Sequence, residues 1–415
     1  MAEDAVHPAE RVIDPPGAAR RGVDRFGILV LNQISEYGLK RLPAERYTVG
    51  KELSQPDAIL VRSADMHALT IPASVQAIGR AGAGTNNVPV QAMSARGVPV
   101  FNAPGGNANA VKELVLVAML MAARNIAPAL RFVAGLDPSS PDMDKTVEGG
   151  KKAFSGIELA GHTLGIVGLG KIGCLVADAA IKLGMNVLGY DPHITVDAAW
   201  NLPSMVKKAS GVDEVLKGSH FISLHVPLVE ATRNLVNADN IGLCRDGTVL
   251  LNFSREGIVN EGAALQALAA NKLAWYICDF PSAAINRHER VVALPHLGAS
   301  TGEAEDNCAV MVADQVRDYL EHGNVVNAVN FPDVRMDRES RYRVAIANAN
   351  VPNMLGQIST AMARAGLNIH NMVNKSRGDM AYTLVDVDSA VEAGVLESIR
   401  ATEGVLSVRY LPIDE

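Results

Sequence analysis

The sequence predicts an α/β protein with two lobes built on parallel sheets, followed by a small antiparallel α/β domain. Short β-branched runs alternate with helical segments over the first 330 residues, which is typical of parallel sheets covered by helices. A glycine-rich turn, GLGKIG, follows one of these strands at residue 168. Beyond a break at 330–340, the chain has a strand–helix–strand–strand–helix–strand rhythm, which predicts a ferredoxin-like βαββαβ domain over 340–415.

Length and composition set the broad class of the protein. A chain of 415 residues is long enough for two or three domains, and its 48% apolar residues can form sizeable cores. The net charge is −7 and no basic stripe appears, so we expect no nucleic-acid partner. An acidic protein can still bind an anionic substrate through a local cationic pocket.

Cysteine usage and hydropathy indicate the compartment. Cysteines at 174, 244, 278 and 308 have no CxxC spacing and no nearby histidine cluster, which predicts a reduced, cytoplasmic protein without disulfides or a bound metal. Residues 1–25 lack the apolar core of a secretory signal and are expected to form a flexible tail. The longest apolar stretch, 114–123, is too short to span a bilayer, so we expect a buried helix and no membrane partner.

The two lobes are predicted from their strands. The first has strands at 26–31, 57–62 and 97–102 and an apolar helix near 111–124. Helical residues 301–321 are expected to return to this lobe, which otherwise lacks a closing helix. A looser stretch over 133–158 is interpreted as a connecting arm. The strands of the second lobe are expected at 163–167, 186–190, 220–226, 248–253, 274–279 and 291–294.

The glycine-rich turn predicts a dinucleotide site. The first glycine permits a tight turn, the second lets the backbone approach a pyrophosphate, and the third lets helix and strand pack closely. The helix that follows offers free N–H groups to the phosphates. Asp191 ends the next strand, where a carboxylate binds the ribose hydroxyls and favours NAD over NADP. A structural turn without a ligand is the alternative. The residues expected at the turn are Gly168, Gly170, Lys171, Ile172 and Gly173.

Two side chains suit the oxidation or reduction of a 2-hydroxy acid. Arg255 follows a strand of the second lobe, and a guanidinium holds a carboxylate in a planar fork. His296, in LPHLGAST, suits the proton transfer because an imidazole titrates near neutral pH. Each residue alone is more often a surface arginine or a structural histidine, so the prediction depends on the combination.

The sequence resembles the D-2-hydroxyacid dehydrogenase family, and within it the branch that acts on D-3-phosphoglycerate, from about residue 26 to the end. The resemblance implies a flavodoxin-like substrate-binding lobe, 26–125 plus 297–330, and an inserted Rossmann-type NAD-binding lobe, 126–296. It implies oxidation of D-3-phosphoglycerate to 3-phosphohydroxypyruvate, the first step of L-serine biosynthesis. The stretches that carry it include VRSA (61–64), GRAGAGTNNV (79–88), GVPVFNAPGGNANAVKEL (97–114), ELAGHTLGIVGLGKIG (158–173), HVPL (225–228), NFSREGIVNE (252–261) and PHLGAST (295–301).

The resemblance also implies a role for each site residue. Arg255 would bind the substrate carboxylate, His296 would move the proton, and Asp279 would contact the nicotinamide carboxamide. Arg62 and Arg80 would be the phosphate partners, since two guanidiniums can neutralise a dianion. The further cofactor residues implied are His225, Val226, Pro227, Phe253, Ser254, Leu297, Gly298 and Ala299. The further substrate residues implied are Ser63, Gly82 and Asn107.

One position departs from the family pattern. The family carries a glutamate, paired with the histidine, five residues after the aspartate that Asp279 represents, and here that residue is Ala284. Glu289 is the nearest acid, but it precedes the strand that leads to His296. Without a carboxylate partner the imidazolium is less stable and the ring less well oriented, which handicaps ketone reduction more than alcohol oxidation. Alternatively, another residue or a water holds the histidine.

Residues 341–415 resemble an ACT domain, a module that binds amino acids at interfaces between copies. Asn348, Asn350 and Asn368 correspond to the positions that bind L-serine in feedback-inhibited relatives, although Asn348 replaces a histidine that is frequent there. Asn353 stands where the family usually has glycine, and asparagine tolerates the left-handed turn. A serine effector and a dimerisation domain without a ligand both stay open. Edge-to-edge pairing of such sheets would link subunits in a homodimer or homotetramer.

Two other functions stay open beside phosphoglycerate oxidation. The first is a dehydrogenase of the same fold that acts on another 2-hydroxy or 2-oxo acid. The second is an NAD-sensing interaction protein with weak catalysis, which the residue at position 284 favours. Arg62 and the regulatory domain favour phosphoglycerate, and both Arg255 and His296 are retained.

Overall fold

The computed structural model describes residues 25–413, and the chain divides into two compact units. The first unit runs to Gly106 and resumes at Glu305, while the second is Asn107–Ala304. The expected tail, 1–25, lies outside the described residues except for Arg25.

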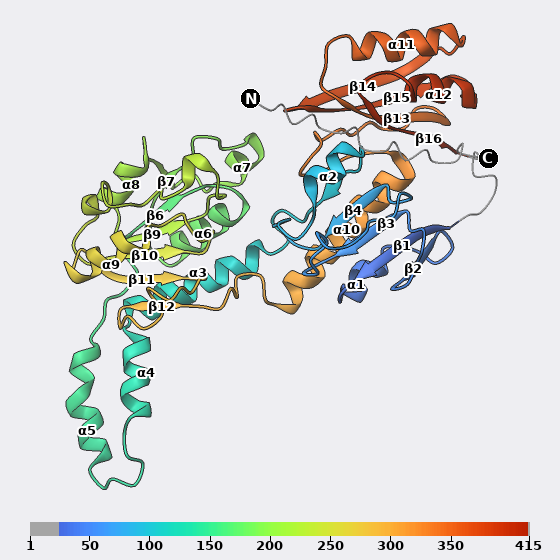
Figure 1. The fold of residues 1–415 in the computed structure, drawn as a ribbon. Helices are drawn as coiled ribbons and strands as arrows, with labels where there is room; N and C mark the ends of the chain where they lie inside the picture. Colours follow the sequence, from blue (N-terminus) through green and yellow to red (C-terminus); the bar gives the residue numbers. More distant parts are fainter. Residues whose placement is uncertain (1–24, 414–415) are drawn as a thin grey trace, which may run out of the picture. The chain divides into compact units, whose positions relative to one another are not determined.

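The first unit contains a five-stranded parallel sheet in the order β2-β1-β3-β4-β5 (Figure 1). Strand β3 is buried along its whole length, as expected for a parallel strand that is covered on both faces. Helix α10 buries Cys308, Val312, Val316 and Leu320 against one face, a spacing that forms one side of a helix. All but the first residues of this helix belong to the first unit, which resumes at Glu305. The elements are β1 Phe26–Leu31, α1 Glu36–Leu39, β2 Tyr47–Gly50, β3 Ala58–Val61, β4 Ala77–Arg80, α2 Val90–Ala95, β5 Val100–Phe101 and α10 Gly302–His322.

The second unit contains a seven-stranded parallel sheet in the order β12-β11-β10-β9-β6-β7-β8. One face packs against α3 and α6, and the other against α8 and α9. The strand order reverses between β6 and β9, which is the position where open α/β sheets bind ligands. The strands are β6 Thr163–Val167, β7 Asn186–Tyr190, β8 Lys207–Lys208, β9 Phe221–Leu224, β10 Thr248–Asn252, β11 Leu273–Cys278 and β12 Val291–Ala293. The helices are α3 Ala108–Ala123, α4 Ile126–Ala134, α5 Met143–Gly150, α6 Lys171–Lys182, α7 Val196–Asn201, α8 Val212–Gly218 and α9 Glu261–Ala269.

Helix α3 differs from the sequence expectation in its lobe. We expected the first lobe to extend to residue 125, but Val111, Val115 and Met119 pack into the core of the seven-stranded sheet. The boundary between the units lies at Gly106, before the helix begins. The helix is apolar on several sides, so its sequence alone did not reveal which sheet it covers.

The arm expected as a loose connection is helical. Helices α4 and α5 form a hairpin that extends from the second unit, and a short 3-10 helix, Lys151–Phe154, follows (Figure 1). The rings of Phe132 and Phe154 lie 5.2 Å apart and hold its two sides together. Both helices are without buried residues, so their amphipathic pattern was harder to recognise in the sequence.

The C-terminal residues form the predicted βαββαβ arrangement as an antiparallel sheet in the order β14-β15-β13-β16. Its helices cover one face through residues such as Ile358 and Ile399. On the other face, Tyr382 and Leu384 join the core that contains α10. The elements are β13 Tyr342–Ala349, α11 Met354–Arg364, β14 Ile369–Arg377, β15 Met380–Val387, α12 Ala393–Arg400 and β16 Val405–Pro412.

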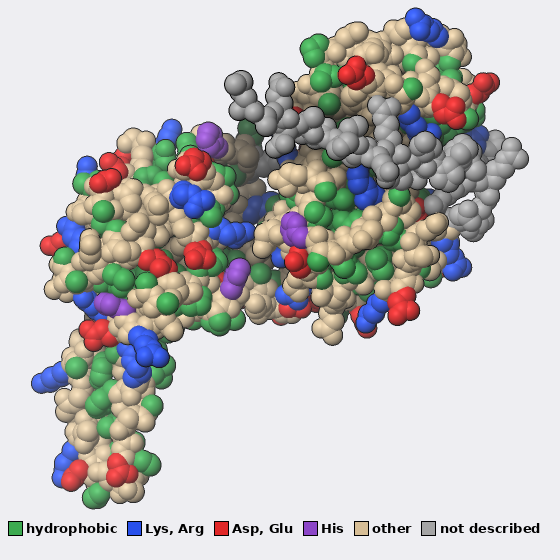
Figure 2. Space-filling view, in the orientation of Figure 1, with side chains coloured by type: hydrophobic (Ala, Val, Ile, Leu, Met, Phe, Trp, Pro, Cys, Tyr) green, Lys and Arg blue, Asp and Glu red, His purple; other side chains and the backbone are tan. Residues whose placement is uncertain are grey.

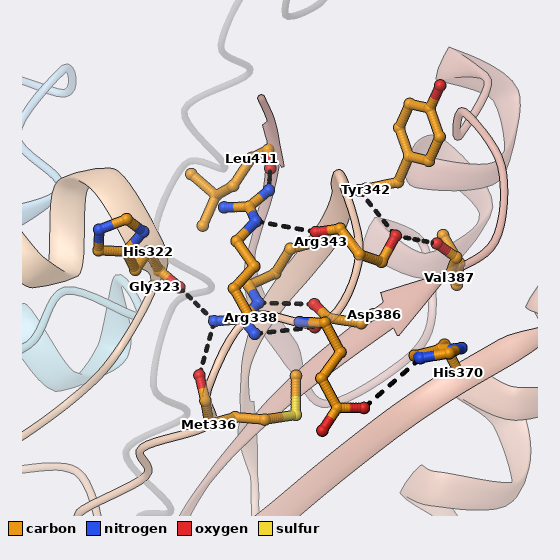
Figure 3. Close-up of polar contacts among 12 residues, drawn as sticks. His322, Gly323, Met336, Arg338, Tyr342, Arg343, His370, Asp386, Val387 and Leu411 are labelled. Carbon is orange, nitrogen blue, oxygen red and sulfur yellow. Dashed lines mark hydrogen bonds and ion pairs between the residues drawn. The ribbon is translucent and has the colours of Figure 1, made fainter. Parts of the chain in front are cut away.

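Arg343 joins this sheet to the end of α10 (Figure 3). Its guanidinium is fully buried and forms two hydrogen bonds with the Asp386 carboxylate, Nε to Oδ1 at 2.6 Å and Nη2 to Oδ2 at 2.9 Å. The remaining N–H groups donate to the backbone carbonyls of His322, Met336 and Asp337, each at 3.0 Å. All five donors of the arginine therefore have acceptors, which a buried charge requires.

The helices between residues 25 and 413 fall short of a bilayer span. No single one of them is both long enough and apolar enough to cross a membrane. The pair α3 and α4 meets both requirements together, but it is bent by 69° at its break.

Candidate active site

The functional side chains predicted in the second unit follow consecutive strands of one parallel sheet. Because the carboxyl ends of parallel strands lie at the same edge of a sheet, these residues share that edge. The glycine turn follows β6 and the proposed proton-transfer residue follows β12, so the site extends across most of the sheet. The residues at this edge are Gly168, Asp191, His225, Arg255, Asp279 and His296.

The glycine turn requires glycine at two places. Gly168 has φ +94°, and a Cβ there would lie 2.3 Å from the carbonyl oxygen of His225. A Cβ on Gly173 would lie 2.0 Å from the Gly168 carbonyl oxygen. Gly170 has open space around its Cβ position and caps α6, whose first residues are Lys171 and Ile172. The turn thus holds the start of α6 close to β6 and leaves the N-terminal N–H groups facing outward.

Asp191 lies beside this turn. One carboxylate oxygen accepts the backbone N–H of Leu169 at 2.8 Å, and the other accepts that of His193 at 2.8 Å. The acid is therefore fixed next to the glycine backbone, where the sequence placed it.

His225 lies under the turn. Its Nε2 is 2.9 Å from the Ser223 hydroxyl, while its buried Nδ1 has no partner in the described structure. Burial lowers the pKa of His225 to about 4, so the ring is neutral at ordinary pH. Val226 follows, and its backbone N–H donates to the Ser254 hydroxyl at 3.1 Å. The exposed Pro227 continues this loop.

Arg255 is exposed and held through its backbone. The buried Asn252 donates to the Arg255 carbonyl at 3.0 Å and accepts the backbone N–H of Ser254 at 3.2 Å. The guanidinium donates from Nη1 to the Ser254 carbonyl at 2.7 Å, and the residue is exposed. Phe253 points into the core. Asn252 was not among the predicted residues, and the signal that could have found it is an asparagine that closes the apolar run of β10.

Asp279 holds the segment that carries His296. Its Oδ1 accepts the backbone N–H of Leu297 and its Oδ2 that of Gly298, both at 2.7 Å. The residue is 2% exposed, and burial raises the pKa of its carboxyl above the ordinary value, although the two N–H groups and the nearby His296 oppose that shift. Asp279 thus binds the loop backbone, a contact that the sequence did not predict. Ala299 continues this loop.

His296 lies in an uncommon backbone conformation. Its φ is +57°, in the left-handed region, and its backbone N–H donates to the Leu294 carbonyl at 3.0 Å. The imidazole is exposed, and its ring centroid lies 5.1 Å from that of Phe280 at an interplanar angle of 61°. Such a conformation persists where surrounding contacts enforce it, and here the Asp279 carboxylate does so.

Within residues 25–413, no carboxylate from position 284 or from Glu289 bonds to His296. Ala284 is an exposed alanine in the loop between β11 and β12. Glu289 precedes β12 whereas His296 follows it, so the two lie at opposite edges of the sheet. The Glu289 carbonyl accepts from Arg131 of α4 at 3.3 Å. Glu289 is therefore excluded as the missing partner.

The edge fits an NAD molecule. The glycine turn leaves backbone N–H groups available, and the open space at Gly170 allows a pyrophosphate to approach. The Asp191 carboxylate beside the turn could accept hydrogen bonds from ribose hydroxyls, and the buried Nδ1 of His225 has no partner within residues 25–413. These features agree with the donor and acceptor chemistry of a dinucleotide.

Two cations of the first unit come from neighbouring strands, since Arg80 ends β4 opposite Val61 of β3 and Arg62 follows Val61. The charges of Arg80 and Arg62 lower the pKa of Cys308 and that of Glu305 raises it, although burial dominates and the net shift is upward. Arg62 Nη1 lies 2.6 Å from Glu305 Oε1, at the first turn of α10. The two predicted phosphate partners thus gather at one place, and Glu305 was not predicted. Its carboxylate suits a helix N-terminus.

The remaining predicted substrate residues are distributed over both units. Ser63 is exposed next to Arg62. Gly82 leaves room for the Arg80 guanidinium, because a Cβ at residue 82 would lie 1.7 Å from Nη1. Asn107 begins the second unit, where its carbonyl accepts the N–H of Val111 at 3.1 Å.

The predicted effector residues lie at two ends of the C-terminal sheet. Asn348 is the penultimate residue of β13, and Asn350, just after the strand, donates to the Gly378 carbonyl at 3.0 Å. Asn368 precedes β14, at the other end, and lines a pocket of about 370 Å³ with Ser359 and Thr360. One chain therefore does not bring the three asparagines together. Asn353 has φ +64°, so it adopts the left-handed turn as expected.

Metal-ligating side chains do not cluster in the described part of the chain. Between residues 25 and 413, no group of three or more His, Cys, Asp and Glu side chains is arranged to hold a metal ion. All four cysteines are free and buried.

Comparison with known proteins indicates similarity to dehydrogenases, both for the second unit and over most of the chain. Residues 116–298 match the D-isomer specific 2-hydroxyacid dehydrogenase, NAD binding domain. The chain is 32% identical to a D-3-phosphoglycerate dehydrogenase of Haemophilus influenzae, over 79% of each chain. It is 31% identical to the Escherichia coli protein of that name, over 81% of each. A third such protein, from Methanocaldococcus jannaschii, is 31% identical over 84% of this chain, which spans 65% of that relative.

A solved structure resembles the fold as well. The NAD+-bound 3-phosphoglycerate dehydrogenase of Entamoeba histolytica superposes with a TM-score of 0.57 at 25% identity. The match covers 74% of this chain and 99% of that one.

Proposed function

The chain belongs to the D-isomer-specific 2-hydroxyacid dehydrogenase family, and from this membership we propose that it oxidises D-3-phosphoglycerate to 3-phosphohydroxypyruvate with NAD, the first step of L-serine biosynthesis. The observation that carries the proposal is the shared sheet edge. There Arg255 and His296 follow strands β10 and β12, and the glycine turn follows β6 of the same sheet.

The protein residues divide the chemistry between them. Arg255, which is exposed, binds the substrate carboxylate through its guanidinium. His296 takes the proton of the C2 hydroxyl as the C2–H bond breaks, and it returns that proton in the reverse reaction. A bound nicotinamide would supply the hydride acceptor. Asp279 fixes the backbone on which the histidine is carried.

The phosphate of the substrate is assigned to Arg62 and Arg80. Both come from the carboxyl ends of the neighbouring strands β3 and β4, and two guanidiniums match a dianion in charge. Substrate binding would take Arg62 from its ion pair with Glu305. A non-phosphorylated acid lacks the charge needed to draw Arg62 away from Glu305. The two arginines therefore favour phosphoglycerate over other 2-hydroxy acids.

A homodimer is proposed through the arm and the adjoining helix. Leu130 and Val133 of α4 are 63% and 52% exposed, and Val117 of α3 is 50% exposed. Figure 2 shows hydrophobic side chains along the arm. Apolar surface of this kind is typical of a face that another chain covers.

The cytoplasm is the proposed compartment of the reaction. Buried free cysteines suit its reducing conditions.

L-serine is proposed as an effector at the C-terminal domain. Asn348 and Asn350 lie at one end of the sheet and Asn368 at the other, so a site made of all three needs two copies. Strand β14 is an edge strand and can pair with its equivalent in a second chain. A dimerisation domain without serine would leave the enzyme insensitive to it.

Ala284 favours a second candidate, an NAD-sensing protein with weak catalysis. The experiment that separates these functions is NADH formation by the full chain with D-3-phosphoglycerate and with a panel of non-phosphorylated D-2-hydroxy acids, each with and without L-serine. Phosphoglycerate should give the highest kcat/KM. NADH binding without turnover of any acid would support the second candidate instead.

A further inference from the structure

The histidine proposed for proton transfer has an aromatic neighbour in place of an acidic one. Phe280 follows β11 and His296 follows β12, and these strands pair in parallel with Cys278 opposite Ala293. The pairing brings the two rings to a centroid distance of 5.1 Å at 61°. Within residues 25–413, the structure has no side-chain hydrogen bond to the imidazole. The ring contact is therefore the feature that can orient it.

Phe280 is itself well fixed. The backbone N–H of the preceding Asp279 donates to the Asn252 carbonyl at 3.2 Å, and the Cys278 thiol lies 3.4 Å from the Phe280 carbonyl. Two residues later, the Ser282 hydroxyl donates to Glu261 of α9 at 2.7 Å. The phenyl ring therefore projects from a backbone anchored on both sides. A rigid base is what a positioning residue needs.

The Asp279 carboxylate is near the same histidine, but its hydrogen bonds are to the backbone of the loop that carries it. Both of its oxygens accept N–H groups of the residues after His296. Its charge also interacts with the imidazole. The backbone of His296 is thus held by the carboxylate, while the direction of the ring is left to its neighbour.

We propose that Phe280 is a positioning residue for His296. The phenyl ring of Phe280 takes over the orienting task that an acid at position 284 would perform. The proposal rests on the proposed function for the role of His296. An aromatic face or edge restricts the imidazole and attracts its protonated form, but it cannot accept a hydrogen bond as a carboxylate does. The contact should therefore matter most when the imidazolium is the reactive form, in ketone reduction.

The test compares Phe280→Leu, which removes the ring, with Phe280→Tyr, which keeps it. Phe26→Leu in the first unit, which removes the ring that faces Tyr47, is the matched control. Phe280→Leu should lower kcat for reduction of 3-phosphohydroxypyruvate about fivefold, change KM less, and move the alkaline limb of the pH profile to lower pH. Phe280→Tyr and Phe26→Leu should keep the parent profile. Parent kcat and pH profile in Phe280→Leu would overturn the proposal.

Two further measurements keep the result interpretable. NADH binding and thermal unfolding of each variant show whether the lobe is intact, and Phe280→Met offers a second ring-free side chain if the leucine variant does not fold. The histidine Cε1–H signal of residue 296, assigned from His296→Gln, should change its titration in Phe280→Leu and not in Phe280→Tyr. That signal decides the positioning proposal even if the chain oxidises no 2-hydroxy acid, an outcome that would refute only the proposed function. An unchanged titration in Phe280→Leu would refute the positioning role.

Discussion

The carboxylate of Asp279 accepts the backbone N–H of Gly298 at 2.7 Å, so a buried acid at the end of one strand fixes the loop after the next. A Cβ at residue 298 would lie 3.0 Å from the same carboxylate oxygen. The close approach makes this contact dependent on glycine. His296 lies at the start of the fixed loop, with φ +57°.

Asp279→Asn should slow the enzyme strongly. An asparagine has one side-chain oxygen, so one of the two backbone N–H groups would lose its acceptor and face an NH2 group. A buried unsatisfied group costs about 1–3 kcal/mol, and a cost of that size in the transition state corresponds to a loss of roughly 5- to 150-fold in kcat/KM. Steady-state NADH formation measures it. Asp279→Glu, which keeps the charge but not the geometry, is the companion variant, and parent activity in Asp279→Asn would contradict the clamp.

His225→Gln should reduce the acid sensitivity of the second unit. The folded pKa of His225 is about 4, below the ordinary 6.5, so the unfolded chain binds a proton first as the pH falls. The stability linked to this ring is complete above pH 6.5 and is lost as the pH falls toward 4. The loss is up to roughly 3 kcal/mol. Urea unfolding of parent and variant at several pH values between these limits should give converging curves, and parallel curves would contradict the linkage.

Ala284→Glu should raise activity, with a larger gain in reduction than in oxidation. A carboxylate that reaches His296 would stabilise its protonated form, and general acid–base catalysis depends on that form in reduction. The expected gain is about tenfold in kcat for reduction. Ala284→Gln, which lacks the charge, is the control. A variant slower than the parent in both directions would show that the missing glutamate is not a defect of this chain.

Glu305→Gln should increase the affinity for phosphoglycerate. The ion pair between Glu305 and Arg62 has to be given up when Arg62 binds a phosphate. Exposed pairs contribute about 0–1 kcal/mol, so KM should fall by no more than about fivefold. KM for a non-phosphorylated D-2-hydroxy acid should not change. A higher KM for phosphoglycerate would mean that Glu305 aligns the guanidinium and does not compete for it.

Arg343→Met should destabilise the first unit. Removal of the guanidinium leaves the fully buried Asp386 carboxylate without its partner, which costs about 3–5 kcal/mol. The double variant Arg343→Met with Asp386→Leu removes both charges and should recover most of that loss. Thermal unfolding of the three proteins gives the comparison. A double variant as unstable as the single one would show that the backbone carbonyls of α10 and the linker carry the arginine's contribution.

The sequence by itself determined the local chemistry of this protein. The glycine turn, Asp191, Arg255 and His296 each follow a strand whose β-branched pattern is readable, and parallel strands bring their carboxyl ends to one edge. The order of the C-terminal elements was readable for the same reason, because periodicity and turn residues are encoded in contiguous segments. The helices of the arm were missed, because they bury none of their residues.

Only the tertiary structure decided which distant residues meet. Helix α3 joined the seven-stranded sheet, although its sequence is apolar enough to cover either. Asp279 contacted the loop backbone, Phe280 came to face His296, and Glu305 paired with Arg62 across more than 200 residues of chain. Such contacts depend on strand order and helix packing, and no pattern within a single segment specifies them.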